Sequence, residues 1–461
     1  MQRDYLGNPL TGRREATLHS IDDFIEGYLA YEARAEHILL AADADPGSCM
    51  ANVYAGTLWM LLEAPEAPVR AAKYLSAAES AAPSASRREQ LNTAMLRAWA
   101  DDDVERAIRL CDQVSDEFPR DLAIVKTHQY LEFNRGNAPA MLRVALKVAA
   151  ANADVPYVYG MKAFGYEQCH LLEEAESEAR SALAMRRKEP WAQHALAHVF
   201  LTRGRIDEGA QFLEDASDTW SGLNSFMVTH IWWHLALFYL SQGRVAEALD
   251  AYDEHCWGVA KDYSQDQVGA ISLLARLELA GVDVGSRWQD LADHLAARAK
   301  DTIQPFLTLQ YLYGLARARR PQAEALLGAV RNQAHNAPEF TRTVWREVAL
   351  PACEGLYSYA CGEYQRAWHQ LSMAMPRMAE AGGSHAQRDL FAQFLLDAAL
   401  KSGRLTAAQH MLELRRGSDP NGVPVNAALA ALYDELGLAG LADQARSRAA
   451  LTRVRHAGKD T

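Results

Sequence analysis

A regular alternation of turns and apolar stripes runs through most of this sequence. In each unit of the pattern a short turn, often glycine followed by a polar residue, is followed four or five residues later by a small side chain that opens a new apolar stripe. The stripes have the spacing of helix faces, so the pattern predicts helices joined in pairs by tight turns. The small marker residues are Ala107, Met141, Ala175, Gly209, Ala248, Ala367, Ala408 and Ala442.

The spacing of these markers points to one kind of repeat. Successive markers are 34, 34, 34, 39, 119, 41 and 34 residues apart by subtraction. A period of 34 residues is that of the tetratricopeptide repeat, a helix-turn-helix unit, and the long gap has room for three slightly longer units, one of them near Ala325. Ala71 extends the series towards the N-terminus. The markers are small because the two antiparallel helices of a unit cross closely there.

The repeats predict an all-α fold, a right-handed α-solenoid of tetratricopeptide-like helix-turn-helix repeats. Clusters of proline and glycine such as "DADPGS" and "GSDPNGVP" have the composition of connections between helices and mark no domain boundary. We therefore expect one continuous solenoid over residues 1–461, with about a dozen helix pairs between about residues 20 and 450 and a frayed tail at 453–461. The first helix of each pair is expected to line a concave groove.

Composition agrees with a helical chain and narrows its partners. Hydrophobic residues make up 49% of the sequence, and runs of Val, Ile and Thr with period-two alternation are scarce. A net charge of -12 without a sustained basic stripe argues against nucleic acid and against an anionic membrane as the main partner. No apolar run approaches the ~18 residues of a membrane span, and the N-terminal stretch lacks the apolar core of a signal peptide. A soluble, cytoplasmic protein is expected.

The six cysteines are scattered without a C-x-x-C pair, so the sequence signals neither a disulfide framework nor a thiolate zinc site. Most are expected to be small buried hydrophobic residues. Phosphate-binding loops, dinucleotide fingerprints and nucleophile elbows are also missing from the sequence, which argues against nucleotide use.

Several segments resemble the tetratricopeptide repeat protein 38 family. They are "LGNPLTG", "AEHILLAADADPGS", "HALAHVFLTRGRIDEG", "HIWWHLALFYLSQGR", "ALDAYDEH", "SLLARLELAGVDVGSRW" and "GGSHAQRDLF", and in this order they span almost the whole chain. The resemblance implies an all-helical solenoid. It implies no particular biochemical activity.

Four histidines are the main candidates for chemistry. His194 and His198 are four residues apart, as are His230 and His234, so each pair presents both imidazoles from one face of a helix. Two such helices side by side would suit zinc or another divalent metal that accepts nitrogen ligands, and without metal the same groups could act as catalytic acids and bases. The glutamate of an H-E-x-x-H metalloprotease helix is missing, and the opposing interpretation is that the histidines only pack.

Further residues are candidates for ligand binding. Asp253 and His255 could orient an imidazole, as could Asp262 or Asp266. In "GGSHAQRDLF", Ser384 and Gln387 fit a helix capping box, which leaves three charged or titratable residues of that segment unexplained. Arg388 is expected to pair with a carboxylate of the protein or, as the second choice, of a ligand. The complete candidate set is Trp191, Trp233, Asp253, His255, His385, Arg388 and Asp389.

Two functions remain open on these grounds. One is a binding module whose groove takes a protein segment, a peptide or a small molecule, with the histidines as part of its wall. The other is an enzyme that acts on a small molecule at the four histidines, either with these residues as acids and bases or with a bound divalent metal ion such as zinc. A homodimer through the solenoid ends or the acidic convex surface also stays open.

Overall fold

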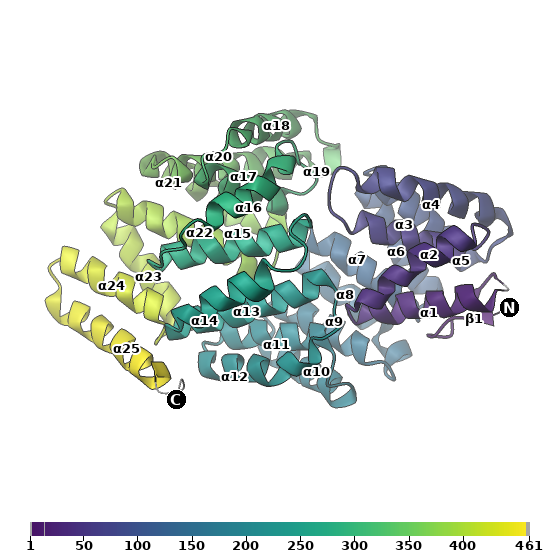
Figure 1. Cartoon of the computed structure of the whole chain (residues 1–461), viewed down its shortest axis with the longest axis horizontal. Coiled ribbons are helices and arrows are strands. Elements are labelled where there is room, and N and C mark those ends of the chain that lie inside the picture. The colour runs from purple at the N-terminus through teal and green to yellow at the C-terminus, as the bar shows by residue number, and fades with distance from the viewer. Residues whose placement is uncertain (1, 13, 458–461) are drawn as a thin grey trace. The chain divides into compact units, whose positions relative to one another are not determined.

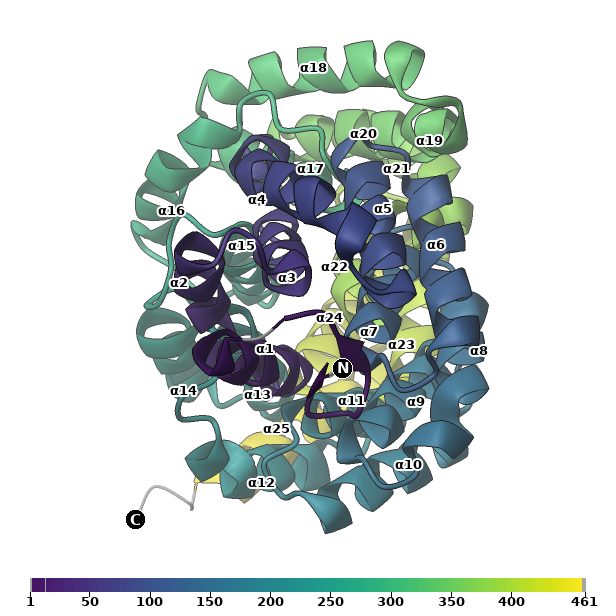
Figure 2. The same ribbon diagram turned by 90° about the vertical axis from the view of Figure 1, so that its right-hand side faces the viewer.

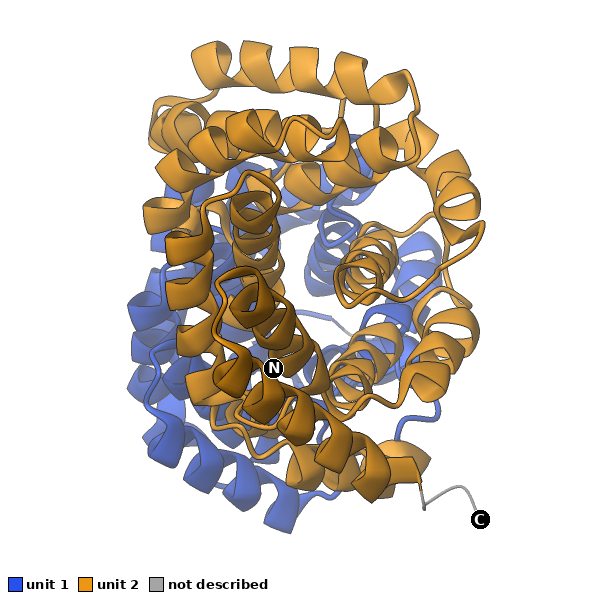
Figure 3. Ribbon diagram, turned by 90° about the vertical axis from the view of Figure 1, so that its left-hand side faces the viewer, with its two compact units in different colours: residues 1–195, 219–227 blue, residues 196–218, 228–461 orange. Residues whose placement is uncertain are grey.

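The protein is described by a computed structural model, which covers residues 2–12 and 14–457. Its helices cluster into two compact units, coloured separately in Figure 3. Unit 1 comprises residues 1–195 and 219–227, and unit 2 comprises residues 196–218 and 228–461. Each unit is described by itself below, and the expectation of a single continuous solenoid stays a prediction.

Unit 1 is an array of helices preceded by one short β-hairpin, in which Gln2 pairs with Leu10. Consecutive helices pack against each other in antiparallel pairs, as can be followed in Figure 2. Polar caps begin several of them, because the first backbone N–H groups of a helix need acceptors; Ser86 and Glu89 form a capping box on α5. The elements are β1 Gln2–Arg3, β2 Pro9–Leu10, α1 Glu15–Leu29, α2 His37–Ala44, α3 Cys49–Met60, α4 Ala67–Ala81, α5 Arg87–Ala100, α6 Val104–Glu117, α7 Leu122–Phe133, α8 Ala138–Ala149, α9 Pro156–Gln168 and α10 Leu172–Met185.

Unit 2 continues the same construction (Figure 1). Helix α11, Pro190–Thr202, begins in unit 1 and ends in unit 2, and α13, Ser225–Gln242, crosses the boundary near its start. A π-helical segment, Ala251–Cys256, extends α14, and another, Trp345–Ala349, joins α19 to α20. The remaining helices are α12 Ile206–Ala216, α14 Val245–Asp250, α15 Ser264–Leu279, α16 Arg287–Leu295, α17 Pro305–Arg317, α18 Gln322–Asn336, α19 Glu339–Val344, α20 Leu350–Ala360, α21 Tyr364–Ala374, α22 His385–Lys401, α23 Leu405–Ser418, α24 Val423–Glu435 and α25 Ala439–Ala457.

The predicted fold class, an all-α solenoid of helix-turn-helix repeats, is confirmed. All eight small markers are buried, and each is the fourth residue of the second helix of its pair. The turns before these helices hold glycines with positive φ, such as Gly204 at +66° and Gly243 at +78°, a backbone region that most side chains disfavour. The 34-residue period therefore corresponds to the spacing of the close helix crossings in successive pairs.

The repeat predicted near Ala325 is present as the pair α17 and α18, in which Ala323 is buried and Ala325 itself is exposed. The expected frayed tail is helical up to Ala457, where α25 ends, and its last residues, 458–461, lie outside the described residues. Thr452 and His456 are buried, which holds this last turn in place.

The helices of unit 2 also meet across long stretches of sequence. Helix α15 packs against α22, and the end of α13 reaches the turn after α23, where the Ser241 hydroxyl donates a 2.6 Å hydrogen bond to Asp419. Contacts of this kind enclose space between helices that a simple stack would leave open. No helix of the described residues is both long and apolar enough to cross a membrane.

The marker position predicts a specific sensitivity to side-chain size. A methyl group added at Gly209 would overlap the ring of Phe238 and lie 3.0 Å from Cβ of Phe200. We expect Gly209→Ala to lower the free energy of unfolding by about 1–3 kcal/mol, as overpacking does in other cores. Thermal unfolding followed by circular dichroism measures this.

The matched control is Gly328→Ala on α18, where an added methyl group meets no atom within 4 Å. There we expect no loss, and a gain of up to about 1 kcal/mol from helix propensity. Equal stability of the two variants would show that the crossing at Gly209 is not tight.

Candidate functional site in unit 2

Three histidines converge in unit 2. His198 lies on α11, while His230 and His234 lie one turn apart on α13. The imidazole centroids of His198 and His234 are 4.6 Å apart, and those of His230 and His234 are 4.8 Å apart. Each of the three offers a ring nitrogen, and these nitrogens lie within 4.8 Å of one another. We call these three residues the histidine cluster.

The cluster is buried, and burial affects the protonation of His230. His198 and His234 have no exposed surface, and His230 is 8% exposed. Burial, with a smaller contribution from nearby His198, lowers the pKa of His230 to about 3. A neutral imidazole keeps a lone pair on one ring nitrogen, the form in which histidine binds metals. His230 therefore has the protonation state that a metal ligand needs.

His194, the fourth predicted residue, lies one turn before His198 on α11, on the unit 1 side of the boundary. The two share a helix face, as their spacing predicted. Within unit 1 the His194 ring stacks on Trp191 with centroids 4.4 Å apart and lies 5.2 Å from the ring of Phe164. Trp191 in turn stacks on Tyr31 at 5.0 Å. Trp191 and His194 thus belong to an aromatic group of unit 1.

A tryptophan connects the histidine cluster to a buried arginine. Trp233, only 1% exposed, is nearly parallel to the His230 ring at a centroid distance of 5.3 Å. The Arg276 guanidinium from α15 lies 5.2 Å from the Trp233 ring centroid, within cation–π range. Trp233, a predicted ligand-binding residue, is therefore packed between the His230 ring and the Arg276 guanidinium.

His385 joins the cluster from α22. Ser384 and Gln387 form the predicted capping box, which makes His385 the first residue of the helix. Its ring meets that of His198 edge-on at 5.3 Å, and its Nε2 lies 3.5 Å from the Thr202 hydroxyl. A local cap thus sets where α22 begins, and with it where this imidazole lies.

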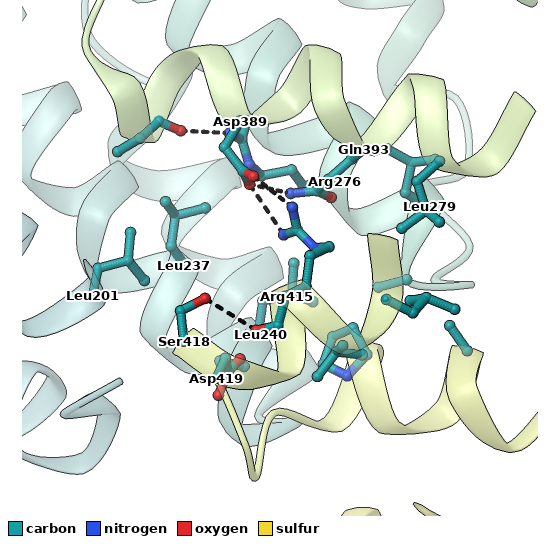
Figure 4. Close-up of a pocket in the computed structure, with 18 of the residues that line it drawn as sticks. Leu201, Leu237, Leu240, Arg276, Leu279, Asp389, Gln393, Arg415, Ser418 and Asp419 are labelled. Atoms are coloured by element: carbon teal, nitrogen blue, oxygen red, sulfur yellow. Dashed lines mark hydrogen bonds and ion pairs between the residues drawn. The ribbon is translucent and has the colours of Figure 1, made fainter. Parts of the chain in front are cut away.

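His385 and Thr202 also line a cavity of about 500 Å³ inside unit 2 (Figure 4). Helices α11, α13, α15, α22, α23 and α24 supply its walls. The apolar part includes Leu201, Leu237, Leu240, Leu279, Leu396, Leu400, Leu412 and Val425. The polar part includes Thr202, Ser241, Arg276, His385, Asp389, Gln393, Arg415, Ser418 and Asp419.

The charged groups of the cavity are partly paired. Asp389 accepts hydrogen bonds from Arg415 at 2.5 and 3.1 Å and from Gln393 at 2.7 Å (Figure 4). Burial raises the pKa of Asp389, but the charge and hydrogen bonds of Arg415 outweigh it and hold that pKa below its usual range. Burial raises the pKa of Asp419 despite the hydrogen bond from Ser241.

The other predicted residues make their contacts elsewhere. Asp253 forms an ion pair with Arg287 at 2.5 Å, and the His255 ring stacks on Trp232 at 3.8 Å. Arg388 was expected to pair with a carboxylate, but the structure gives it a backbone partner, the carbonyl of Gly383 in the loop before α22. Asp253 and His255 therefore do not orient the histidine cluster through these contacts.

The proposed orienting acids Asp262 and Asp266 also have other contacts. Asp262 bonds His294 at 2.9 Å, and Asp266 accepts a 3.1 Å hydrogen bond from the Thr229 hydroxyl and a 3.0 Å bond from the backbone N–H of Ala260. Asp266 thus anchors α13 one residue before His230. Asp266 therefore stabilises the position of α13, the helix that carries His230 and His234, and does not bond an imidazole through these contacts.

Sequence reasoning missed Arg276, Arg415 and Asp419. A signal existed for Arg276, because this charged residue interrupts the apolar run "SLLARLEL", in which Leu273, Leu274 and Leu277 are all buried. Arg415 and Asp419 lie in an ordinary polar stretch near the end of α23. Only their long-range contacts with α22 and α13 single them out.

No protein-family model matches the chain. Among solved structures it is similar to human IFIT1, in a dimer with PPP-AAAA, at 12% identity over 94% of this chain and 98% of that chain, with a TM-score of 0.42. It is also similar to the P58(IPK) TPR domain, at 14% identity over 79% of this chain and 92% of that chain, with a TM-score of 0.23. Likeness at this level carries no information about ligands.

The Asp389–Arg415 pair predicts a pH-dependent stability. Because the folded-state pKa of Asp389 lies below the value of an unfolded aspartate, near 3.9, its contribution is present above about pH 4 and is lost as the pH falls below it. We expect Asp389→Asn to cost about 1–2 kcal/mol at pH 6, a figure discounted because 35% of the side chain is exposed. Urea unfolding at pH 3 to 7 measures it.

The difference between wild type and Asp389→Asn should shrink as the pH falls towards 3. Arg415→Gln serves as the matched partner variant, since it removes the same pair from the other side. A difference that stays constant over the whole range would contradict the assigned pKa direction.

Proposed function

We propose that unit 2 binds a small molecule in its cavity, with His385 and Thr202 in the wall and the histidine cluster behind them. The observation that carries this proposal is the cavity itself, at about 500 Å³. Small-molecule sites have volumes of about 300–1,000 Å³, mostly apolar walls and a few convergent polar groups. The leucines and the arginine, aspartate and histidine side chains of this cavity fit that description.

A partner segment in an open groove is the alternative that repeat proteins offer most often. The cavity favours the small molecule, because six helices from both ends of unit 2 contribute to its walls. Membership of the tetratricopeptide repeat protein 38 family is part of the proposal, supported by the shared segments and the confirmed repeat phase. The expectations of a cytoplasmic location, of no nucleic acid or membrane partner and of a homodimer stay predictions.

Filling the cavity tests the proposal. Leu237 on α13 lines it and is 9% exposed, so Leu237→Trp should occupy part of its volume. Saturation-transfer NMR with a library of small fragments should find compounds that bind the wild-type chain. We expect Leu237→Trp to weaken their binding at least tenfold.

The matched control is Leu451→Trp on α25, where the leucine is 68% exposed and outside the cavity. It should bind the same fragments as the wild type. Fragments that bind both variants equally well, or no fragment binding to the wild type, would contradict a small-molecule site in this cavity.

A second candidate function is a metal-dependent enzyme, favoured by the three ring nitrogens within 4.8 Å. Three imidazoles match the ligand set of catalytic zinc sites, where Zn–N distances are about 2.0–2.1 Å and a fourth position stays open. His198, His230 and His234 would hold the ion; His194, from the preceding turn of α11, is the proposed fourth residue, and its coordination would close the open position and make the site structural. A bound divalent ion supplies Lewis acidity or an activated water. His385, on the cavity wall, would face the substrate as the group that donates or accepts a proton.

Elemental analysis and zinc titration test the metal proposal. Wild-type protein should bind about one zinc ion, and His198→Gln and His234→Gln should each weaken binding at least tenfold because each removes one nitrogen ligand. His410→Gln is the control, since His410 is an exposed histidine on α23.

Two results would reject the metal proposal. One is zinc binding that is unchanged in His198→Gln and His234→Gln. The other is a wild-type protein without near-stoichiometric zinc, in which the same variants lower the melting temperature of the metal-free chain by several degrees. That second result would assign the histidines to packing.

A further inference from the structure

Arg276 is a buried cation in the wall of the cavity. It is 3% exposed and lies on α15 among apolar neighbours. Its guanidinium donates to the Ala386 carbonyl at 2.8 Å and to the Ser272 hydroxyl, and it faces the Trp233 ring. All these partners are neutral. Within residues 2–12 and 14–457, no carboxylate lies within ion-pair distance of Arg276.

A buried charge without a counter-ion is unfavourable. Removing a guanidinium from water costs several kcal/mol unless an opposite charge or several hydrogen bonds replace the solvent. Burial lowers the pKa of Arg276 to about 10, which leaves it protonated at neutral pH. The fold therefore keeps a positive charge at the cavity wall with no carboxylate in direct contact with it, and Asp389 acts on this charge only from beyond ion-pair distance.

Asp389 offsets the charge of Arg276 only in part, because it attracts Arg276 from beyond ion-pair distance while its hydrogen bonds go to Arg415 and Gln393. Asp397 forms a 2.7 Å ion pair with Lys401. The Asp419 carboxylate accepts a hydrogen bond from the Ser241 hydroxyl. These carboxylates are engaged with other partners, and the direct partners of Arg276 are all neutral.

The position of the Arg276 charge relative to the apolar walls indicates the chemical class of the ligand. Leu201, Leu237, Leu240 and Leu412 form its apolar walls. Arg276 is bonded to the carbonyl of Ala386, the residue after His385, so its charge lies at the His385 end of the cavity. An arginine offers a planar fork of donors that matches a carboxylate.

We propose that the ligand of unit 2 is an amphipathic monocarboxylate, with its apolar body against the leucines and its carboxylate at Arg276. This inference rests on the proposed small-molecule function and adds the chemical class of the ligand. The carboxylate of the ligand supplies the ion-pair partner that Arg276 lacks. This contact places the polar end of the ligand next to His385.

Isothermal titration calorimetry of the full chain with three probes of equal chain length tests the inference. The probes are decanoate, decanol and decylamine, in buffer with EDTA so that no metal can bind the carboxylate. Decanoate should bind at least tenfold more tightly than decanol, and decylamine more weakly than both. Arg276→Gln should lower the affinity for decanoate at least tenfold and leave that for decanol within about twofold.

Two further variants separate charge from folding. Arg276→Lys keeps the positive charge and should retain the preference for decanoate over decanol. Arg331→Gln is the matched control, because Arg331 is an exposed arginine of α18 in the same unit, paired with Glu354. It should bind all three probes like the wild type. If Arg276→Gln fails to fold, the three probes on the wild-type chain still decide the matter.

The outcomes distinguish this inference from the proposed function. Equal affinity for decanoate and decanol, or a preference that survives in Arg276→Gln, overturns the carboxylate while the small-molecule cavity stands. The carboxylate is also overturned, and the small-molecule cavity stands, if fragments bind in a Leu237-dependent way but none of the three probes binds. No binding of either probes or fragments overturns both.

Discussion

The close crossing of two helices at a small residue is the constraint on which the rest of this structure depends. Gly209 shows it most clearly, because Phe238 and Phe200 fill the space where a side chain would be. The same crossing recurs at buried alanines such as Ala175 and Ala248, always at the fourth residue of the second helix. Each pair thus has the same geometry, and successive pairs can stack in a regular way.

Stacking puts the first helices of neighbouring pairs side by side, and the histidine cluster follows from it. Residues four apart share a helix face, so His230 and His234 point together from α13, and α11 presents His198 to them. Burial lowers the pKa of His230, so this imidazole stays neutral and the cost of burying it is limited. The convergence of the three imidazoles therefore needs no irregularity of the backbone, only neighbouring repeats that each carry a histidine on the inner face.

The cavity has a different origin, since it depends on contacts between distant repeats. Ser241 bonds Asp419 across 178 residues, Thr202 meets His385 across 183, and Arg276 bonds Ala386 across 110. These polar contacts tie α22 and α23 to α11, α13 and α15. They surround a volume whose walls are leucine and whose polar groups are mostly paired. Arg276 is the exception, because its direct partners are all neutral, and stability alone gives no reason to keep a buried charge there.

The sequence by itself determined the helical class, the repeat period, the buried markers, the capping box at Ser384 and the shared face of each histidine pair. All of these depend on residues close together in the chain, where helix periodicity and cap chemistry are strong signals. Only the tertiary structure decided that His385 meets His198, that Arg388 bonds a backbone carbonyl, and that Arg276, Arg415 and Asp419 line one cavity. The reason is physical: which side chains meet across more than a hundred residues depends on how small rotations between repeats add up, and no local pattern records that sum.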